Sequence, residues 1–181
     1  VERYDVMYND FVLVGPKDDP LGIKTNSPSD IVATLQTISE NKATFVSRGD
    51  DSGTHKKELA IWKAAGITPE GDWYVSAGKG MGDVLQMTNE MLGYTISDRA
   101  TYLKMKDDLD LDILCEGASD MLNYYGVITV NPDKNDQINY DGAKAFADWL
   151  VSERGQQLIS EYGVEEFGAP LFFPNASANA Q

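Results

Sequence analysis

The chain has 181 residues, of which 42% are hydrophobic and 10% aromatic, enough to bury a sizeable core in one or two domains. Its 29 acidic residues outnumber 15 basic residues and give a net charge of −14, which disfavours nucleic-acid binding because contacts to phosphates need a basic face. No apolar run approaches the roughly 20 residues that a membrane-spanning helix needs, and the single cysteine, Cys115, has no partner for an internal disulfide.

Strand-like and helix-like patterns alternate along the chain. Apolar runs predict strands over residues 5–14, 43–47, 73–76, 94–97, 111–115 and 125–130. Apolar residues at helical spacing predict helices over residues 28–38, 54–65, from 81 onward, 98–104, 139–150 and 154–162. This alternation is typical of an α/β fold with a largely parallel sheet. In such a sheet, ligands bind beyond the carboxyl ends of the strands, beside the amino ends of helices.

Local signals define the ends and faces of the first helices. Ser27 is expected to cap the helix at 28–38, with Pro28 at its first position. In the next helix we expect Leu59, Trp62 and Ala65 to form the apolar stripe.

The most informative segment is the polar turn from Ser47 to His55, which joins a predicted strand to a predicted helix. Ser52, Gly53 and Thr54 open that helix. The first N–H groups of a helix have no partner within the helix and lie at its positive end, so they bind anions. Arg48 adds planar, charge-assisted donors just ahead of them. The segment therefore predicts a site for a small oxyanion.

Two acidic residues lie inside this turn. We expect Asp51 to cap the helix and Asp50 to orient Arg48 or the backbone, so that both support the site together with Ser47 and His55. A catalytic carboxylate pair is the alternative interpretation.

His55 is the one histidine of the chain. A hydrolase in which His55 activates Ser52 is a second hypothesis, although the spacing of three residues would need unusual geometry. Zinc is not expected, because His55 has no histidine or cysteine partner nearby. The run that begins at Asp133 lacks the glycine and glutamate of a calcium loop. We therefore predict no metal site and no cofactor.

A second glycine-rich turn, Gly78 to Gly82, also lies between a predicted strand and a predicted helix. Gly80 and Met81 offer further N–H groups at that helix start. The glycine spacing lacks the pattern of a nucleotide-binding P-loop.

Six segments together resemble the tungstate-binding component of bacterial ABC transporters. They are YNDFVLVGPKDDP, FVSRGDDSGTHKKELAIWKAAGI, GKGMG, YTISDRATYL, YYGVITVNP and FADWLVSERGQQLISEYG, and they extend from about Asp5 to Ala176. The resemblance implies a type II periplasmic binding-protein fold with two α/β lobes that close on tungstate or molybdate. It also implies delivery to a membrane permease with its ATPase, at a periplasmic or extracellular, membrane-tethered location.

The resemblance also implies which residues face the oxyanion. In that family the arginine and the hydroxyl-rich helix start do so, and here they match Arg48, Ser52, Gly53 and Thr54. A looser analogy with molybdate-binding proteins adds the helix start at Gly80–Met81 and the strand end at Thr95.

The family carries an additional N-terminal segment of about half a lobe, so we expect the N-terminal part of the first lobe to be absent from this chain. Residues 1–15 and 123–181 would then belong to the first lobe and residues 16–122 would form the complete second lobe. The opening residues, VERYD, do not resemble a signal peptide, so we expect a processed or truncated product. A second chain that completes the first lobe is a further expected partner. An effector-sensing module of the same fold remains an alternative function.

Overall fold

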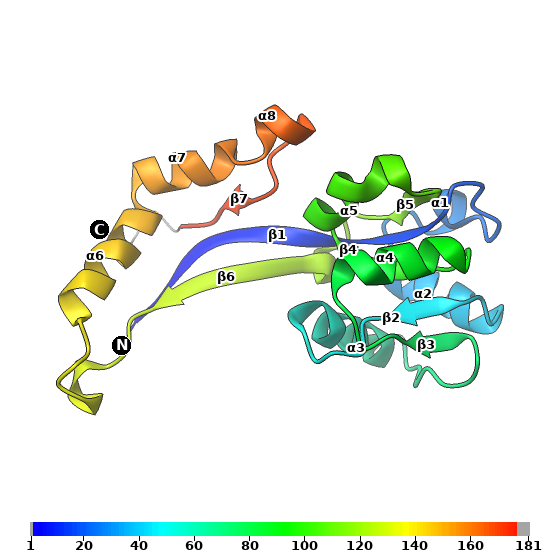
Figure 1. The fold of residues 1–181 in the computed structure, drawn as a ribbon, viewed down its shortest axis with the longest axis horizontal. Helices are drawn as coiled ribbons and strands as arrows, with labels where there is room; N and C mark the ends of the chain where they lie inside the picture. Colours follow the sequence, from blue (N-terminus) through cyan, green and yellow to red (C-terminus); the bar gives the residue numbers. More distant parts are fainter. Residues whose placement is uncertain (1, 177–181) are drawn as a thin grey trace. The chain divides into compact units, whose positions relative to one another are not determined.

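A computed structural model describes residues 2–176 of the chain (Figure 1). The chain divides into two compact units. The central unit comprises Asp10–Leu122, and the terminal unit comprises the residues up to Asn9 and those from Asn123 onward. The α/β class predicted from the sequence is confirmed.

The first strand, β1 (Arg3–Pro16), begins in the terminal unit and ends in the central unit. The other elements of the central unit are α1 (Ile23–Asn26), α2 (Ile31–Glu40), β2 (Phe45–Ser47), α3 (Gly53–Ala64), β3 (Tyr74–Ser76), α4 (Met81–Glu90), β4 (Thr95–Asp98), α5 (Arg99–Met105) and β5 (Leu111–Cys115). The terminal unit adds β6 (Leu122–Ile128), α6 (Tyr140–Val151), α7 (Glu153–Glu161), α8 (Val164–Phe167) and β7 (Phe173–Pro174). The short helices α1 and α8 and the short strand β7 have no counterpart among the predicted elements.

The strands of the central unit combine parallel and antiparallel pairs. β2 and β3 are parallel, and a parallel bridge joins Phe45 of β2 to Tyr94 at the start of β4. β1 is antiparallel to both β4 and β5. The prediction of mainly parallel sheets is therefore right around β2 and wrong around β1. Helical crossovers make the strands that they join parallel, whereas the apolar pattern of a strand does not encode the direction of its neighbours.

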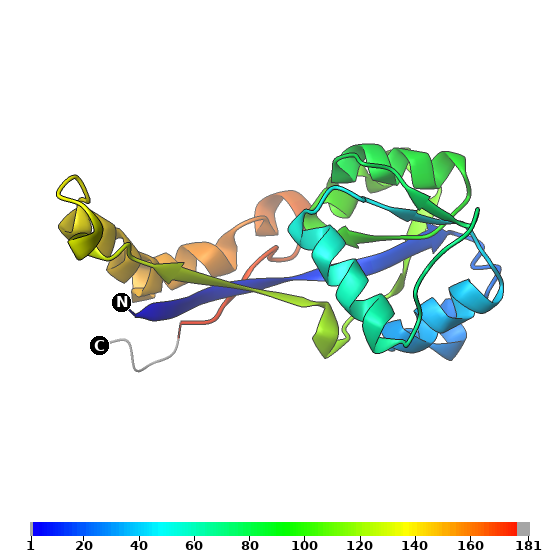
Figure 2. The same cartoon turned by 90° about the horizontal axis from the view of Figure 1, so that it is seen from below.

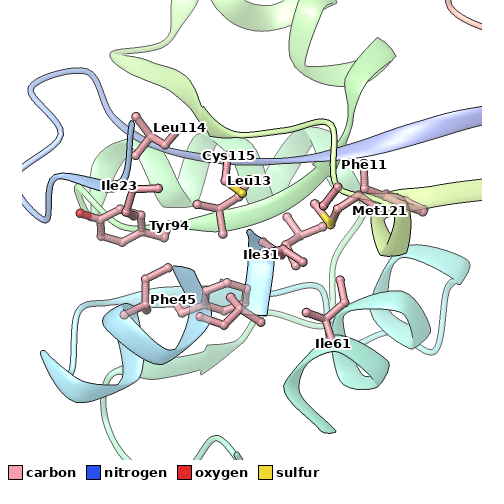
Figure 3. Close-up of a cluster of buried hydrophobic side chains, with 14 of the residues drawn as sticks. Phe11, Leu13, Ile23, Ile31, Phe45, Ile61, Tyr94, Leu114, Cys115 and Met121 are labelled. Carbon is pink, nitrogen blue, oxygen red and sulfur yellow. The ribbon is translucent and has the colours of Figure 1, made fainter. Parts of the chain in front are cut away.

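Two hydrophobic cores lie on opposite faces of β1. Phe11 and Leu13 belong to the core that α2 and α3 cover, and Val12 and Val14 belong to the core that α4 and α5 cover. Figure 2 shows α2 and α3 on one side of β1 and α4 and α5 on the other. Figure 3 shows the first core, in which Phe45 lies among residues from helices and strands that are distant in the sequence. Because successive side chains of a strand point to opposite faces, a strand buried on both faces is apolar throughout.

Two predictions about helix ends and faces need correction. Asp30 caps α2 by accepting a hydrogen bond from the N–H of Ala33, so Ser27 is not the cap. Ser27 is buried, and its hydroxyl lies 2.8 Å from that of Thr34. In α3 the predicted apolar stripe is wrong for Leu59, whose side chain is 43% exposed.

The terminal unit exposes many large apolar side chains. β6 and β7 both pair with β1, and Tyr8 of β1 contacts the rings of Tyr124 and Phe173. On α6, the rings of Phe146 and Trp149 stack 6.1 Å apart and remain 59% and 45% exposed. None of the helices within residues 2–176 is both long enough and apolar enough to cross a membrane.

Candidate anion-binding site

The structure brings the two predicted turns together at one edge of the central unit. β2 and β3 are parallel and in register, with Ser47 opposite Ser76, so the turn after each strand begins at the same edge. The N–H of Ala77 donates to the carbonyl of Ser47 at 2.9 Å, and the N–H of Lys79 donates to the carbonyl of Arg48 at 3.2 Å. The turns lead into α3 and α4, which places the amino ends of two helices at this edge (Figure 1).

The amino end of α3 keeps unpaired backbone donors. Ser52 is the N-cap, and its hydroxyl oxygen accepts a hydrogen bond from the N–H of His55 at 3.2 Å. The N–H of Lys56 donates to the carbonyl of Ser52. Within residues 2–176, the N–H groups of Gly53 and Thr54 have no such acceptor, as is usual for the first turn of a helix. Thr54 is only 9% exposed, so its contribution comes mainly from its backbone.

The amino end of α4 lacks any side-chain cap. Gly80 is the N-cap residue in extended conformation, and Met81, 6% exposed, begins the helix. The N–H of Val84 donates to the carbonyl of Gly80. The preceding N–H groups therefore face the edge with no side chain of the cap residue in front of them.

Arg48 is held beside these donors by Asp50. One terminal nitrogen of the guanidinium donates to Asp50 Oδ2 at 2.6 Å and Nε donates to the same oxygen at 3.2 Å. Asp50 Oδ1 accepts a hydrogen bond from the N–H of Ser52 at 3.2 Å. Hydrogen bonds from Ser52 and Arg48 lower the pKa of Asp50 from 3.8 to about 2. Both contacts expected for Asp50, to Arg48 and to the backbone, are present.

Asp51 does not cap α3, because Ser52 does. Asp51 has a left-handed backbone with φ of 58°, and its carboxylate is exposed. Its N–H donates to Nδ1 of His55 at 3.1 Å, so Nδ1 is an acceptor and the proton of the neutral ring is assigned to Nε2. The prediction failed because Asp50, Asp51 and Ser52 are all good capping residues and only backbone geometry selects among them.

The same contacts give no support to a hydrolase. A histidine that activates a serine must accept the proton of its hydroxyl. In residues 2–176, the bond between Ser52 and His55 instead joins the serine hydroxyl to the backbone N–H of the histidine. The histidine's Nδ1 is occupied by Asp51.

Thr95 is buried, and its hydroxyl is already bonded to the backbone of the neighbouring strand. Thr95 is the first residue of β4, is 1% exposed and donates its hydroxyl proton to the carbonyl of Val46 at 2.6 Å. Because the start of β4 runs parallel to β2, the end of β4 at Asp98, rather than its start, lies toward the edge of the two turns. The hydroxyl of Thr95 therefore supports the sheet.

Ser47 and Glu58 form a polar contact behind the first turn. Ser47 is 1% exposed and donates its hydroxyl proton to Glu58 Oε2 at 2.7 Å. Glu58 was not predicted as part of the site, although it precedes Trp62 by one helical turn and so lies on the same face of α3. No group of three histidine, cysteine or acidic residues in the part of the chain that the structure describes is arranged to hold a metal ion.

Comparison with known proteins places the chain in a family. Residues 1–154 match the PBP superfamily domain. The tungstate-binding protein TupA of Peptoclostridium acidaminophilum is 65% identical over 177 residues, which cover 98% of this chain and 62% of that protein. The chain thus spans less than two thirds of the length of the curated relatives that it matches.

Solved structures of similar proteins point to the same family. The tungstate-binding protein TupA of Desulfovibrio alaskensis G20 is 38% identical with a TM-score of 0.85, over 97% of this chain and 71% of that one. The tungstate ABC transporter protein of Geobacter sulfurreducens is 47% identical with a TM-score of 0.78, over 90% of this chain and 68% of that one. The chain therefore belongs to the PBP superfamily, in the family that includes these TupA proteins.

Proposed function

We propose that this chain binds a tetrahedral oxyanion, tungstate or molybdate, at the edge formed by the two turns, and that it does so without catalysis. The observation that carries the proposal is the meeting of two helix amino ends beside Arg48. Backbone N–H groups at such ends are suited to a small dianion. The names of the relatives from three bacteria support tungstate as the ligand.

The proposed donors are the guanidinium of Arg48 and the N–H groups that open the two helices, at Gly53 and Thr54 in α3 and beyond Gly80 in α4. Ser52 has a hydroxyl proton left to donate, because its oxygen is the acceptor in its bond with His55. Asp50 holds Arg48 in place. Its carboxylate is ionised and so has no proton to donate to the anion. Asp51, His55 and Ser47 support the turn, and Thr95 supports the strand behind it.

A role in transport follows as part of the same proposal. The relative from Geobacter sulfurreducens is described as a tungstate ABC transporter protein. We propose that the present protein delivers its anion to a membrane permease with a partner ATPase, and that it works in the periplasm or tethered outside the membrane.

We further propose that the central unit, residues 10–122, forms the second lobe of a binding protein and that the terminal unit contributes part of the first. The boundary expected after residue 15 then moves to residue 9, because residues 11–14 of β1 lie in the two cores of the central unit. The apolar surface of the terminal unit supports this division. The stacked rings of Phe146 and Trp149 are 59% and 45% exposed, and exposed apolar clusters of this kind mark interaction surfaces. The surface would bind the polypeptide that completes the first lobe, either a further segment of the same protein or a second chain.

Calorimetric titration of the full-length protein tests the ligand. Tungstate, molybdate and sulfate are the three titrants, since all are tetrahedral dianions that the same N–H donors could bind. Saturable one-to-one binding of tungstate or molybdate is expected, and absence of binding to both would refute the proposal. Mass analysis of the isolated natural protein tests the lobe assignment. A mass above that of 181 residues, or a two-chain assembly, supports it, and a monomer of this mass that binds fully would contradict it.

A further inference from the structure

A buried carboxylate lies behind the first turn. Glu58, on α3, is 3% exposed. It accepts three hydrogen bonds, from Ser47 Oγ at 2.7 Å, Trp62 Nε1 at 3.1 Å and the hydroxyl of Tyr74 at 2.6 Å. The ion pairs found within residues 2–176 do not include Glu58. A buried charge is costly unless hydrogen bonds replace its lost water, and here three neutral donors do so.

The three donors come from three different elements. Ser47 is the last residue of β2, Tyr74 is the first residue of β3, and Trp62 lies on α3 itself. The ring of Tyr74 stacks on that of Phe45 and meets the edge of the Trp62 ring. Glu58 therefore fixes the helix relative to both strands whose ends carry the turns.

The hydrogen bond between Glu58 and Ser47 is linked to both turns through the backbone of Ser47 and Arg48. Ser47 is followed directly by Arg48, and the carbonyls of these two residues accept the N–H groups of Ala77 and Lys79 from the second turn. A shift of Ser47 would consequently move Arg48 and loosen the contact between the turns.

The hydrogen-bond donors to Glu58 keep their protons at neutral pH. Burial and the hydrogen bond to Glu58 raise the pKa of Tyr74, so its hydroxyl keeps its proton. Trp62 Nε1 can only donate. Glu58 is consequently surrounded by groups that favour an acceptor at its position.

We propose that Glu58 is a positioning residue of the oxyanion site, which holds Ser47 and, through it, Arg48 and the second turn where their donors converge. This inference rests on the proposed function. A negative charge behind an anion site opposes binding by Coulomb repulsion, and an apolar side chain could fill the same volume. The benefit of the carboxylate is therefore geometric.

Calorimetric titration of the full-length protein with tungstate tests this with four variants. Glu58→Ala removes all three bonds and is expected to weaken binding roughly 10- to 100-fold, as loss of a supporting contact does at metal sites. Glu58→Gln is expected to stay within about threefold of the parent. Its amide oxygen can accept from Trp62 and Tyr74, while its NH₂ group donates to Ser47 Oγ. Rescue by glutamine separates positioning from a need for charge.

Leu35→Ala is the matched control for lost stability. Leu35 is fully buried on α2 in the same core, and its apolar side chain can form no hydrogen bond to either turn. At a temperature where circular dichroism shows each variant folded, Leu35→Ala should bind tungstate as the parent does. A loss in Leu35→Ala equal to that in Glu58→Ala would overturn the proposal, because any destabilised variant would then bind poorly.

Ser47→Ala completes a double-mutant cycle. It also replaces Glu58→Ala as the test of the Ser47–Glu58 contact if Glu58→Ala does not fold. It should weaken binding, and the Ser47→Ala/Glu58→Ala double variant should lose little more than the worse single variant. Parent affinity in a folded Glu58→Ala or in Ser47→Ala would overturn the inference alone. A parent that does not bind tungstate would overturn the proposed function instead.

Discussion

Replacement of Arg48 by alanine is the most direct perturbation of the proposed site. The Arg48 side chain is 19% exposed, and its Nε and one terminal nitrogen are occupied by Asp50. Its other terminal nitrogen has no acceptor among the hydrogen bonds of residues 2–176, so it is available to a ligand. Alanine removes this donor and also leaves the ionised Asp50 unneutralised beside the anion.

The size of the effect follows from the contacts. A hydrogen bond to a charged group contributes about 1.5–3 kcal/mol. Since each 1.4 kcal/mol is a factor of ten, losing one such bond weakens binding roughly 10- to 150-fold. Repulsion from Asp50 adds to this loss, so the Arg48→Ala/Asp50→Asn double variant should recover part of it. Arg48→Lys should be intermediate, because it keeps the charge without the planar fork.

Calorimetric titration with tungstate at fixed ionic strength measures the effect. Lys63→Ala is the matched control, because Lys63 is an exposed cation in the last turn of α3, at the opposite end of the helix. It changes the net charge equally and should leave the affinity within about twofold, since salt screens distant charges. Arg48→Ala with an affinity within threefold of the parent would refute the assignment of Arg48.

Three further predictions concern stability. Gly49→Ala should lower the free energy of unfolding in urea by about 1–3 kcal/mol, because Gly49 has φ of 59° and a Cβ there would lie 2.1 Å from Ser76 Oγ. Gly53→Ala, whose Cβ meets nothing within 4 Å, should match or exceed the parent, and equal stability of the two alanine variants would contradict this reasoning. Burial raises the pKa of Glu58 above 4.5, so the parent should lose stability as pH rises from about 4.5 through the raised value. Glu58→Gln lacks this loss, and a pH-independent difference in unfolding free energy between the two proteins would refute the raised pKa. Leu35→Ala should cost about 2–5 kcal/mol in thermal or urea unfolding, as a buried leucine does, and a cost below 1 kcal/mol would show that the core tolerates the cavity.

The sequence was sufficient where the signal is local. The first turn is a continuous segment between a strand and a helix, and its glycines, hydroxyls and arginine can be identified without knowing the rest of the fold. The second turn follows the same order of strand, glycines and helix. Their meeting at one edge could be expected because strands joined by a helical crossover run parallel, as β2 and β3 do.

The site predictions are wrong where the outcome depends on the direction of a strand or of a side chain in three dimensions. Thr95 was assigned to a strand end by analogy, but the register with Val46 makes it a strand start with an occupied hydroxyl. On α3, spacing alone allows an inward face through Leu59 and Trp62. The structure instead buries Thr54, Glu58, Ile61 and Trp62. A glutamate in an amphipathic helix is assigned to solvent by any hydropathy pattern. The burial of Glu58 is explained by hydrogen-bond donors on β2, on β3 and on α3 itself.

The topology of β1 also determines how the protein can reach its folded state. Its residues 11–16 pair with β4 and β5, whose partner residues lie roughly 80 to 100 positions later in the chain. Long-range pairing of this kind slows folding. During synthesis at about 5–20 residues per second, β1 emerges and then waits roughly 5–20 s for its neighbours. Residues 11–14 of β1 are apolar on both faces. Over that interval their hydrogen-bonding edges have no partner, so this segment of the newly made chain needs protection by chaperones.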